Sequence, residues 1–486
     1  MDHNSPEFHL GLLRSLAIAR LNADSRSSGT SHKNPVLQSG ISSATSPTLD
    51  QHTRRMAPLL DALAAICPHK EGQVYAVTMS LSAEKVTLFV SENKLVSKEA
   101  TDHLESVWDS VVAINRAAHG APPSVGAPSV CLAELIRQLK VKIYTFSHAW
   151  LKARLAKRWA LLEPFLLDYR ETLGRDFIVY FVSLQRALYD ESPNFRIVAA
   201  EFDDISKLPE SQDFKGSEAK WAIQERGWIA RNEALVNEWK GENGRAFAPH
   251  RCIAKLFAFH THVQSIINVA LSRRLSTYLS SSTIKVVPVE PRVCSDIRAA
   301  LTIEDIDAAI RAHIDATEYS EKYEAAVKDA IKRVAIAQET NIERSAHCEC
   351  SLLAYHLQHP EINPLRYIAV SKPPCFACRV FFRFYNRHAR EFGQVPFGFK
   401  ESEADGKLYP GWSFLCNDGS APPRVISLLA KVKEAMTEDV KARVRQQVRK
   451  ALAPDESQVY EALDPETWAL LKESHERAAA SLGMSL

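Results

Sequence analysis

The hydrophobic pattern of the first hundred residues changes from a helical period to a strand period. Apolar side chains first recur at intervals of three and four, at Leu59, Leu60, Leu63 and Ile66. This spacing gives one apolar face and predicts a helix. Residues 74–80 and 85–91 then alternate β-branched or aromatic side chains with polar ones, which predicts a β-hairpin. The sequence therefore predicts a helix and a hairpin within residues 55–95.

The middle of the chain, residues 96–339, has a mainly helical pattern. A break rich in Gly, Pro and Ser at 119–129 precedes a long stretch of helical periodicity that ends near Leu279. Within that stretch, residues 195–202 are predicted to form a strand because they read FRIVAAEF. We expect a large, mainly helical insertion, to which the sequence assigns no role.

Residues 340–452 return to an alternation of helix and strand. A helix begins near Ala346, a short strand is predicted at 366–371, and a second helix starts after Pro374. A chain with this order of elements usually packs helices on both faces of a sheet. We therefore expect an α/β fold with a three-layer αβα core, formed by 55–95 together with 340–452 and interrupted by the insertion.

The two ends of the chain are predicted to lie outside this core. Residues 25–48 contain eleven Ser or Thr in twenty-four positions and are too polar to offset the entropy lost on ordering. Residues 1–54 are therefore expected to be an N-terminal helix followed by a disordered linker, and 453–486 a helical tail. The N-terminal residues lack the pattern of a secretory signal.

Composition and charge exclude several classes of protein. With 46% apolar and 24% charged residues, the chain is neither collagen-like, nor mostly disordered, nor disulfide-dense. The formal net charge of +2 provides no global field that attracts nucleic acid or membrane. Nine cysteines favour free thiols or metal ligands over a disulfide framework. We expect an intracellular protein, cytoplasmic or nuclear, without a membrane partner.

Potential metal ligands lie at the two predicted helix starts. His347 and Glu349 open the first helix, and Cys375 and Cys378 follow Pro374 at the second. The spacing H-x-E, then P-C-x-x-C, is the signature of zinc deaminases that act on nucleobases. A helix start carries unpaired N–H groups and a partial positive charge, which favours a thiolate. We expect His347, Cys375 and Cys378 to bind Zn²⁺ and to leave its fourth position open to water.

These residue types also predict a reaction. Zinc lowers the pKa of bound water to about 7, and Glu349, which is not a ligand, is expected to shuttle the proton to the ring nitrogen of the base. Zinc-bound hydroxide then adds to C4 of cytosine or C6 of adenine, and ammonia leaves. The predicted substrate is a nucleobase in a nucleotide or a single-stranded nucleic acid.

Three segments within residues 345–416 carry a family resemblance: HCECSLLAY, YIAVSKPPCFACRVFF and GKLYPGWSF. They resemble the cytidine-deaminase-like superfamily and, more narrowly, a family of predicted nucleic-acid or nucleotide deaminases common in fungi. The resemblance implies a cytidine-deaminase-like core and favours cytosine over adenine. It also makes three residues candidates for substrate binding: Tyr409 and Trp412 in the trailing motif, and Asn93, where related deaminases contact a sugar.

An alternative interpretation of the cluster is a closed structural site. Cys350 lies three residues after His347 and so on the same helical face. Together with Cys375 and Cys378 it would complete four ligands and leave no open position. The protein would then be a non-catalytic, zinc-stabilised interaction module.

A row of arginines follows the second cysteine pair, at Arg379, Arg383, Arg387 and Arg390. These positions share one face of the predicted helix, with aromatic side chains between them. Such a face is typical of a strip that binds the phosphates of a nucleic acid. It is equally typical of an amphipathic helix whose arginines are solvated or paired. Arg379 and Arg383 are therefore candidates for substrate binding.

Overall fold

The computed structural model describes most of the predicted core. The described ranges are 49–82, 85–119, 131–168, 193–207, 249–279, 283–292, 345–399, 412–415 and 421–452, with a few isolated positions near residues 6–13 and 183–188. The predicted linker at 25–48, the predicted tail at 453–486 and Tyr409 lie outside them.

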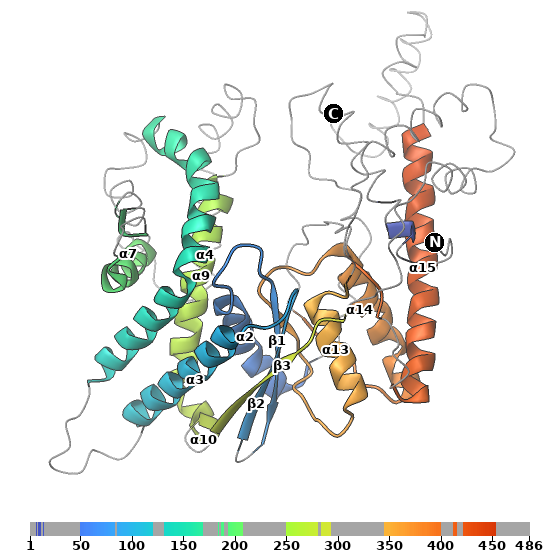
Figure 1. Ribbon diagram of the computed structural model, residues 1–486, viewed down its shortest axis with the longest axis horizontal. Helices are drawn as coiled ribbons and strands as arrows, with labels where there is room; N and C mark the ends of the chain where they lie inside the picture. The colour runs from blue at the N-terminus through green and yellow to red at the C-terminus, as the bar shows by residue number, and fades with distance from the viewer. Residues whose placement is uncertain are drawn as a thin grey trace, which may run out of the picture.

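One four-stranded sheet forms the centre of the fold (Figure 1). Its strands are β1 (Tyr75–Leu81), β2 (Lys85–Glu92), β3 (Thr283–Val289) and β4 (Ala369–Val370), in the order β3-β2-β1-β4. β1 and β2 form the predicted antiparallel hairpin, and β1 also pairs antiparallel with β4, with Ala76 opposite Val370. β2 pairs in parallel with β3. The hairpin and the strand between the two motif helices therefore lie in one sheet.

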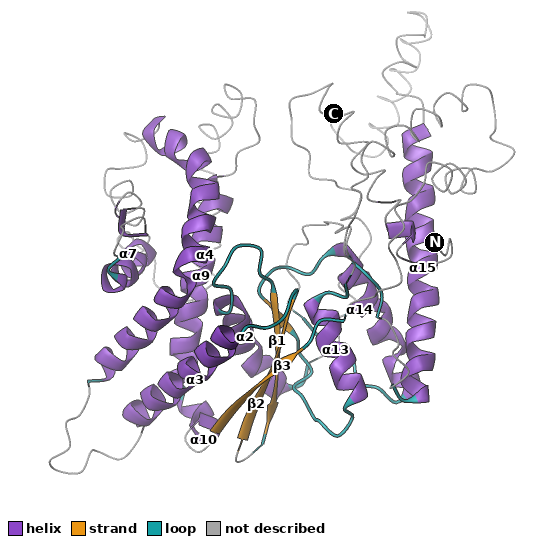
Figure 2. Ribbon diagram, viewed as in Figure 1, coloured by secondary structure: helices purple, strands orange, loops and turns teal. Residues whose placement is uncertain are grey.

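Helices cover both faces of this sheet (Figure 2). One face carries α2 (Gln51–Ile66), α3 (Lys98–His119), α4 (Leu132–Asp168), α7 (Phe195–Lys207), α9 (Pro249–Ala270), the short 3₁₀ helix Arg273–Leu275 and α10 (Ser276–Leu279). The other face carries α13 (Cys348–Gln358), α14 (Phe376–His388), the 3₁₀ helix Ala389–Phe392 and α15 (Pro423–Leu452). The predicted α/β fold is confirmed.

The alternation of β1 and β2 explains why the sheet has two cores. Val77 and Val90 are buried among the helices on the α2 face, whereas Ala76 and Phe89 are buried among those on the α13 face. Successive side chains of a strand point to opposite faces, so a strand with helices on both sides is apolar at nearly every position. The core is thus divided into two layers by the sheet.

The prediction of a strand at 195–202 is wrong, because these residues belong to helix α7. Val198 and Ala199 are buried against the layer that also holds α4 and α9. Val198 and Ala199 lie three and four positions after Phe195, so these side chains share one face of a helix, whereas a strand would divide them between its two faces.

Strand β3 was not predicted. It lies inside the segment 96–339, which therefore contributes a strand to the sheet in addition to its helices. Pro288 has no N–H group to donate, and β3 tolerates it because an edge strand has one side without a partner. The predicted strand at 366–371 is shorter than expected and is regular only at Ala369–Val370.

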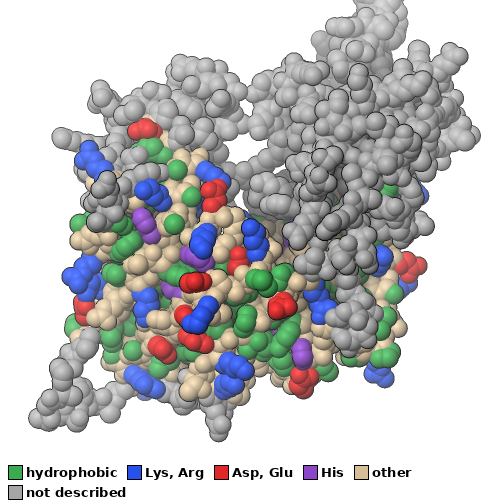
Figure 3. Space-filling view, in the orientation of Figure 1, with side chains coloured by type: hydrophobic (Ala, Val, Ile, Leu, Met, Phe, Trp, Pro, Cys, Tyr) green, Lys and Arg blue, Asp and Glu red, His purple; other side chains and the backbone are tan. Residues whose placement is uncertain are grey.

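None of the described helices combines the length and the apolarity needed to cross a bilayer. On the face drawn in Figure 3, the described Lys and Arg side chains are interspersed with Asp and Glu. This mixture agrees with the small net charge of the chain.

Candidate metal centre

The starts of α13 and α14 lie beside each other. His347 is the N-cap of α13 and Cys375 the N-cap of α14, and both have extended backbone conformations. The Cys378 N–H donates to Cys375 Sγ at 3.4 Å, so the first turn of α14 folds around its own sulfur. An extended N-cap followed by a helical turn directs both cysteine side chains to the same end of the helix.

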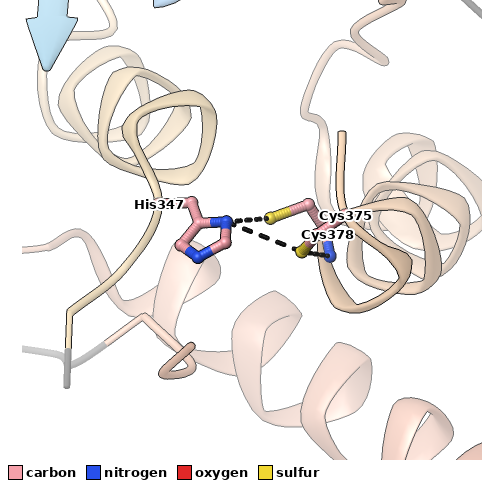
Figure 4. A group of neighbouring side chains, drawn as sticks. All are labelled: His347, Cys375 and Cys378. Atoms are coloured by element: carbon pink, nitrogen blue, oxygen red, sulfur yellow. Dashed lines mark hydrogen bonds between the residues drawn. The ribbon is translucent and has the colours of Figure 1, made fainter. Parts of the chain in front are cut away.

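His347 points across the gap toward the two sulfurs (Figure 4). Its Nδ1 atom lies 3.5 Å from Cys375 Sγ and 3.4 Å from Cys378 Sγ. The three ligand atoms all lie within 4.8 Å of one another, and among the described residues this is the group that qualifies as a metal site. In a tetrahedral zinc site, ligands about 2.0–2.3 Å from the ion are roughly 3.3–3.8 Å apart. The three side chains therefore fit a zinc ion.

Burial makes these sulfurs reluctant to ionise. Burial raises the pKa of the Cys375 and Cys378 thiols well above their ordinary value. Burial on its own lowers the pKa of His347, but its hydrogen bond to the Cys375 sulfur and the charge of Glu349 outweigh this and raise it to about 9. A metal ion requires thiolate and neutral imidazole, so its binding at this site releases protons.

Glu349 lies in the first turn of α13 and is only 5% exposed. The Cys348 thiol donates to its Oε2 atom at 3.4 Å. The charge of Glu349 helps to raise the pKa of His347, but Glu349 is not one of the three residues that could hold the metal. The structure thus holds a buried carboxylate near the candidate ligands and outside their set.

Cys350 lies close to the group without joining it. Its Sγ atom is 3.8 Å from Cys378 Sγ. It is nevertheless absent from the set of ligand atoms that lie within 4.8 Å of one another. This geometry favours three protein ligands over four.

Trp412, which the sequence made a candidate for substrate binding, contacts one of the candidate metal ligands. Its indole Nε1 donates to Cys378 Sγ at 3.2 Å, and the side chain is buried. The sequence pattern placed Trp412 in the trailing motif but held no signal for this hydrogen bond.

Among the described candidate substrate residues, Asn93 and Arg383 have partners within the fold. The exposed Asn93, at the end of β2, accepts a hydrogen bond from Val74 N at 3.0 Å and so holds the end of the hairpin. Arg383 forms an ion pair with Asp439 of α15 at 2.7 Å. Arg379 lies half-buried one turn earlier on α14.

Sequence reasoning also missed a support for His347. The Ala346 N–H donates to Arg292 O at 2.9 Å, directly after β3. Arg292 N donates in turn to Ser351 Oγ at 3.4 Å. The residue before the candidate ligand is therefore tied to the sheet by a segment more than fifty positions away, which no local pattern reveals.

Residues 346–416 match a family model described as OTT_1508-like deaminase. No curated protein and no solved structure shows significant similarity to the chain. The matched segment contains His347, Cys375 and Cys378, which the structure brings together. The chain therefore carries a deaminase-like domain with a His/Cys/Cys group that can hold a metal ion.

Proposed function

We propose that the protein is a zinc-dependent hydrolytic deaminase that acts on a nucleobase. The observation that carries the proposal is the combination of a three-ligand group with a buried carboxylate, Glu349, beside it and outside it. A catalytic zinc site has three protein ligands and an open position, whereas a structural site is closed by four.

The residues of the chain have distinct tasks in this reaction. His347, Cys375 and Cys378 would hold the ion, which when bound supplies a Lewis acid and an acidic water molecule at neutral pH. Glu349 takes up one proton from the attacking water and delivers it to the ring nitrogen of the base, and it then transfers the second proton of that oxygen to the leaving amine. The carbon–nitrogen bond breaks, a carbonyl replaces the amine, and ammonia is released.

The substrate class is the finer part of the proposal. The family resemblance favours cytosine over adenine, in a nucleotide or a single-stranded nucleic acid. A nucleic acid bound through its phosphates loses affinity steeply as salt rises, whereas a small nucleotide shows a shallow response. Oligonucleotide affinity measured over a salt series therefore distinguishes the two substrates.

A second candidate function is a zinc-stabilised interaction module without catalysis. The 3.8 Å separation of Cys350 Sγ and Cys378 Sγ supports it, since a small movement would add a fourth sulfur ligand. The proximity of Glu349 supports the enzyme instead, because a closed structural site has no use for a buried carboxylate.

The decisive experiment replaces Glu349 by Gln and measures ammonia release from cytosine and adenine nucleotides and oligonucleotides. We expect a loss of about 10²–10⁴-fold in turnover with unchanged zinc content, since proton transfer is lost and the ligands remain. Glu434→Gln, the same chemical change on an exposed position of α15, is the matched control and should keep full activity. Unaltered turnover in Glu349→Gln would refute the assigned role.

A further inference from the structure

We propose that Trp412 is a positioning residue of the metal centre, which fixes the sulfur of Cys378 through its indole N–H. The inference rests on the proposed function for its catalytic consequence. Its geometric basis is independent of any substrate.

In the contact between the two side chains, only Trp412 can be the hydrogen-bond donor. The Trp412 Nε1 atom lies 3.2 Å from Cys378 Sγ, within the range of an N–H···S hydrogen bond. Indole nitrogen only donates, so the sulfur must accept. Trp412 is 3% exposed and Cys378 is fully buried, so water does not compete for the sulfur. The hydrogen bond gains strength when the sulfur becomes a thiolate, as it does on binding a metal.

Trp412 is anchored to both elements that supply ligands. Its backbone pairs with Ser345, two residues before His347, and the Ser413 N–H donates to Ser345 O at 3.2 Å. Phe414, two residues further on, packs edge-to-face on Phe381 of α14 with ring centroids 5.4 Å apart. One short segment therefore connects the start of α13 with the body of α14.

The hydrogen bond and the backbone pairing of Trp412 hold Cys378 Sγ at the distance from His347 that a shared metal ion requires. Cys378 Sγ must stay near His347 Nδ1, from which it lies 3.4 Å away, for the two to share an ion. Partners that hydrogen-bond to metal ligands orient them, and the loss of such a partner typically weakens metal binding by about 10–100-fold. Trp412 meets this description through its donor and through its backbone pairing.

The test compares Trp412→Phe with Trp108→Phe in the full-length chain. Trp108 is a buried tryptophan on the opposite face of the sheet, and among the described residues its Nε1 has no hydrogen-bond partner. Zinc affinity is measured by competition with a chromophoric chelator. We expect Trp412→Phe to bind zinc about 10–100-fold more weakly and Trp108→Phe to bind like the wild type. In the cobalt-substituted protein, the sulfur-to-metal charge-transfer band should shift for Trp412→Phe alone.

Equal zinc affinity of Trp412→Phe and the wild type would overturn the proposal. Should Trp412→Phe fail to fold, benzothienylalanine at position 412 keeps the ring shape and replaces only the N–H, and the same loss of affinity is expected. These measurements need no substrate. A wild-type protein that binds zinc but releases no ammonia from any nucleobase would contradict the proposed function alone.

Discussion

The two faces of the sheet use their buried polar groups in different ways. On the α13 face, ionisable side chains stand at helix starts and converge on one point, as His347 and Cys375 do. On the α2 face, one network of polar side chains lies within helices α4, α7 and α9, away from the helix starts. Tyr144 Oη lies 2.9 Å from His260 Nδ1, and Lys140 Nζ donates to Asp203 at 2.7 Å.

Burial and hydrogen bonding therefore do not by themselves mark a reactive centre. Tyr144 and His260 resemble parts of a proton relay, yet Tyr144 is completely buried within the helical layer. A helix start has backbone N–H groups free to act on a ligand, whereas mid-helix positions have none. The polar network on the α2 face therefore connects helices α4, α7 and α9 to one another. We assign the proposed deamination to the α13 face, where the helix starts converge.

Removing a candidate ligand should perturb the protein most. Cys375→Ala removes one of the three candidate ligands, and we expect the zinc content of the purified protein to fall from about one ion per chain to near zero. Cys67→Ala, a buried cysteine on the α2 face, should retain its zinc. Elemental analysis gives both values. Loss of zinc from Cys67→Ala as well would erase the distinction between the faces.

Arg383 tests whether the arginines of α14 serve structure or substrate. Its side chain is 10% exposed and paired with Asp439. We expect Arg383→Met to lower the free energy of unfolding by roughly 0.5–1.5 kcal/mol, because the Asp439 carboxylate loses one arginine partner and keeps Arg443. Arg390→Met, at an exposed position, should change it by less than about 0.5 kcal/mol. An Arg383→Met variant of full stability but reduced oligonucleotide affinity would favour the phosphate-binding strip.

The α2 face should make the protein sensitive to acid through His103. Burial, reinforced by the charges of Lys142 and His69, lowers the pKa of His103 to about 3. The unfolded chain binds a proton below about pH 6.5 and the folded chain does not, so stability decreases as pH falls from about 6.5 to about 3. Between pH 7 and pH 5 this histidine should cost about 2 kcal/mol.

His103→Phe removes this titration and preserves the stacking on Phe146, whose ring centroid is 3.8 Å away. Urea unfolding at pH 7 and pH 5 should therefore show a smaller loss of stability in the variant than in the wild type. Identical losses would mean that His103 is charged in the folded protein, contrary to its burial.

Replacing Cys350 should change zinc content and turnover least. In a three-ligand centre, Cys350→Ser should keep its zinc and its turnover within a few-fold of the wild type, since the sulfur contacts Cys378 without belonging to the ligand group. Cys131→Ser, the same change at an exposed cysteine, is the control for zinc content and turnover. Loss of zinc from Cys350→Ser alone would establish the closed site and end the enzymatic interpretation.

The sequence predicted those parts of the molecule whose determinants are close together in the chain. The hairpin followed from its alternation, and the ligand group from two short motifs that each lie at a helix start. Strand β3 could not be predicted, because its partner β2 is about two hundred positions earlier and its short apolar run has no local turn to identify it. The hydrogen bond from Trp412 to Cys378 depends on tertiary contacts alone.

The pairing of β1 with β4 has a consequence for biosynthesis. Ala76 and Val77 find their partners at Val370 and Ala369, almost three hundred residues later. At a translation rate of about 5–20 residues per second, the first strand leaves the ribosome roughly 15–60 s before the last one exists. Throughout that interval its outer edge is open to strands of neighbouring nascent chains. The scaffold of the metal centre is completed late in translation, so a stalled ribosome releases a chain with an uncapped sheet and no place for the ion.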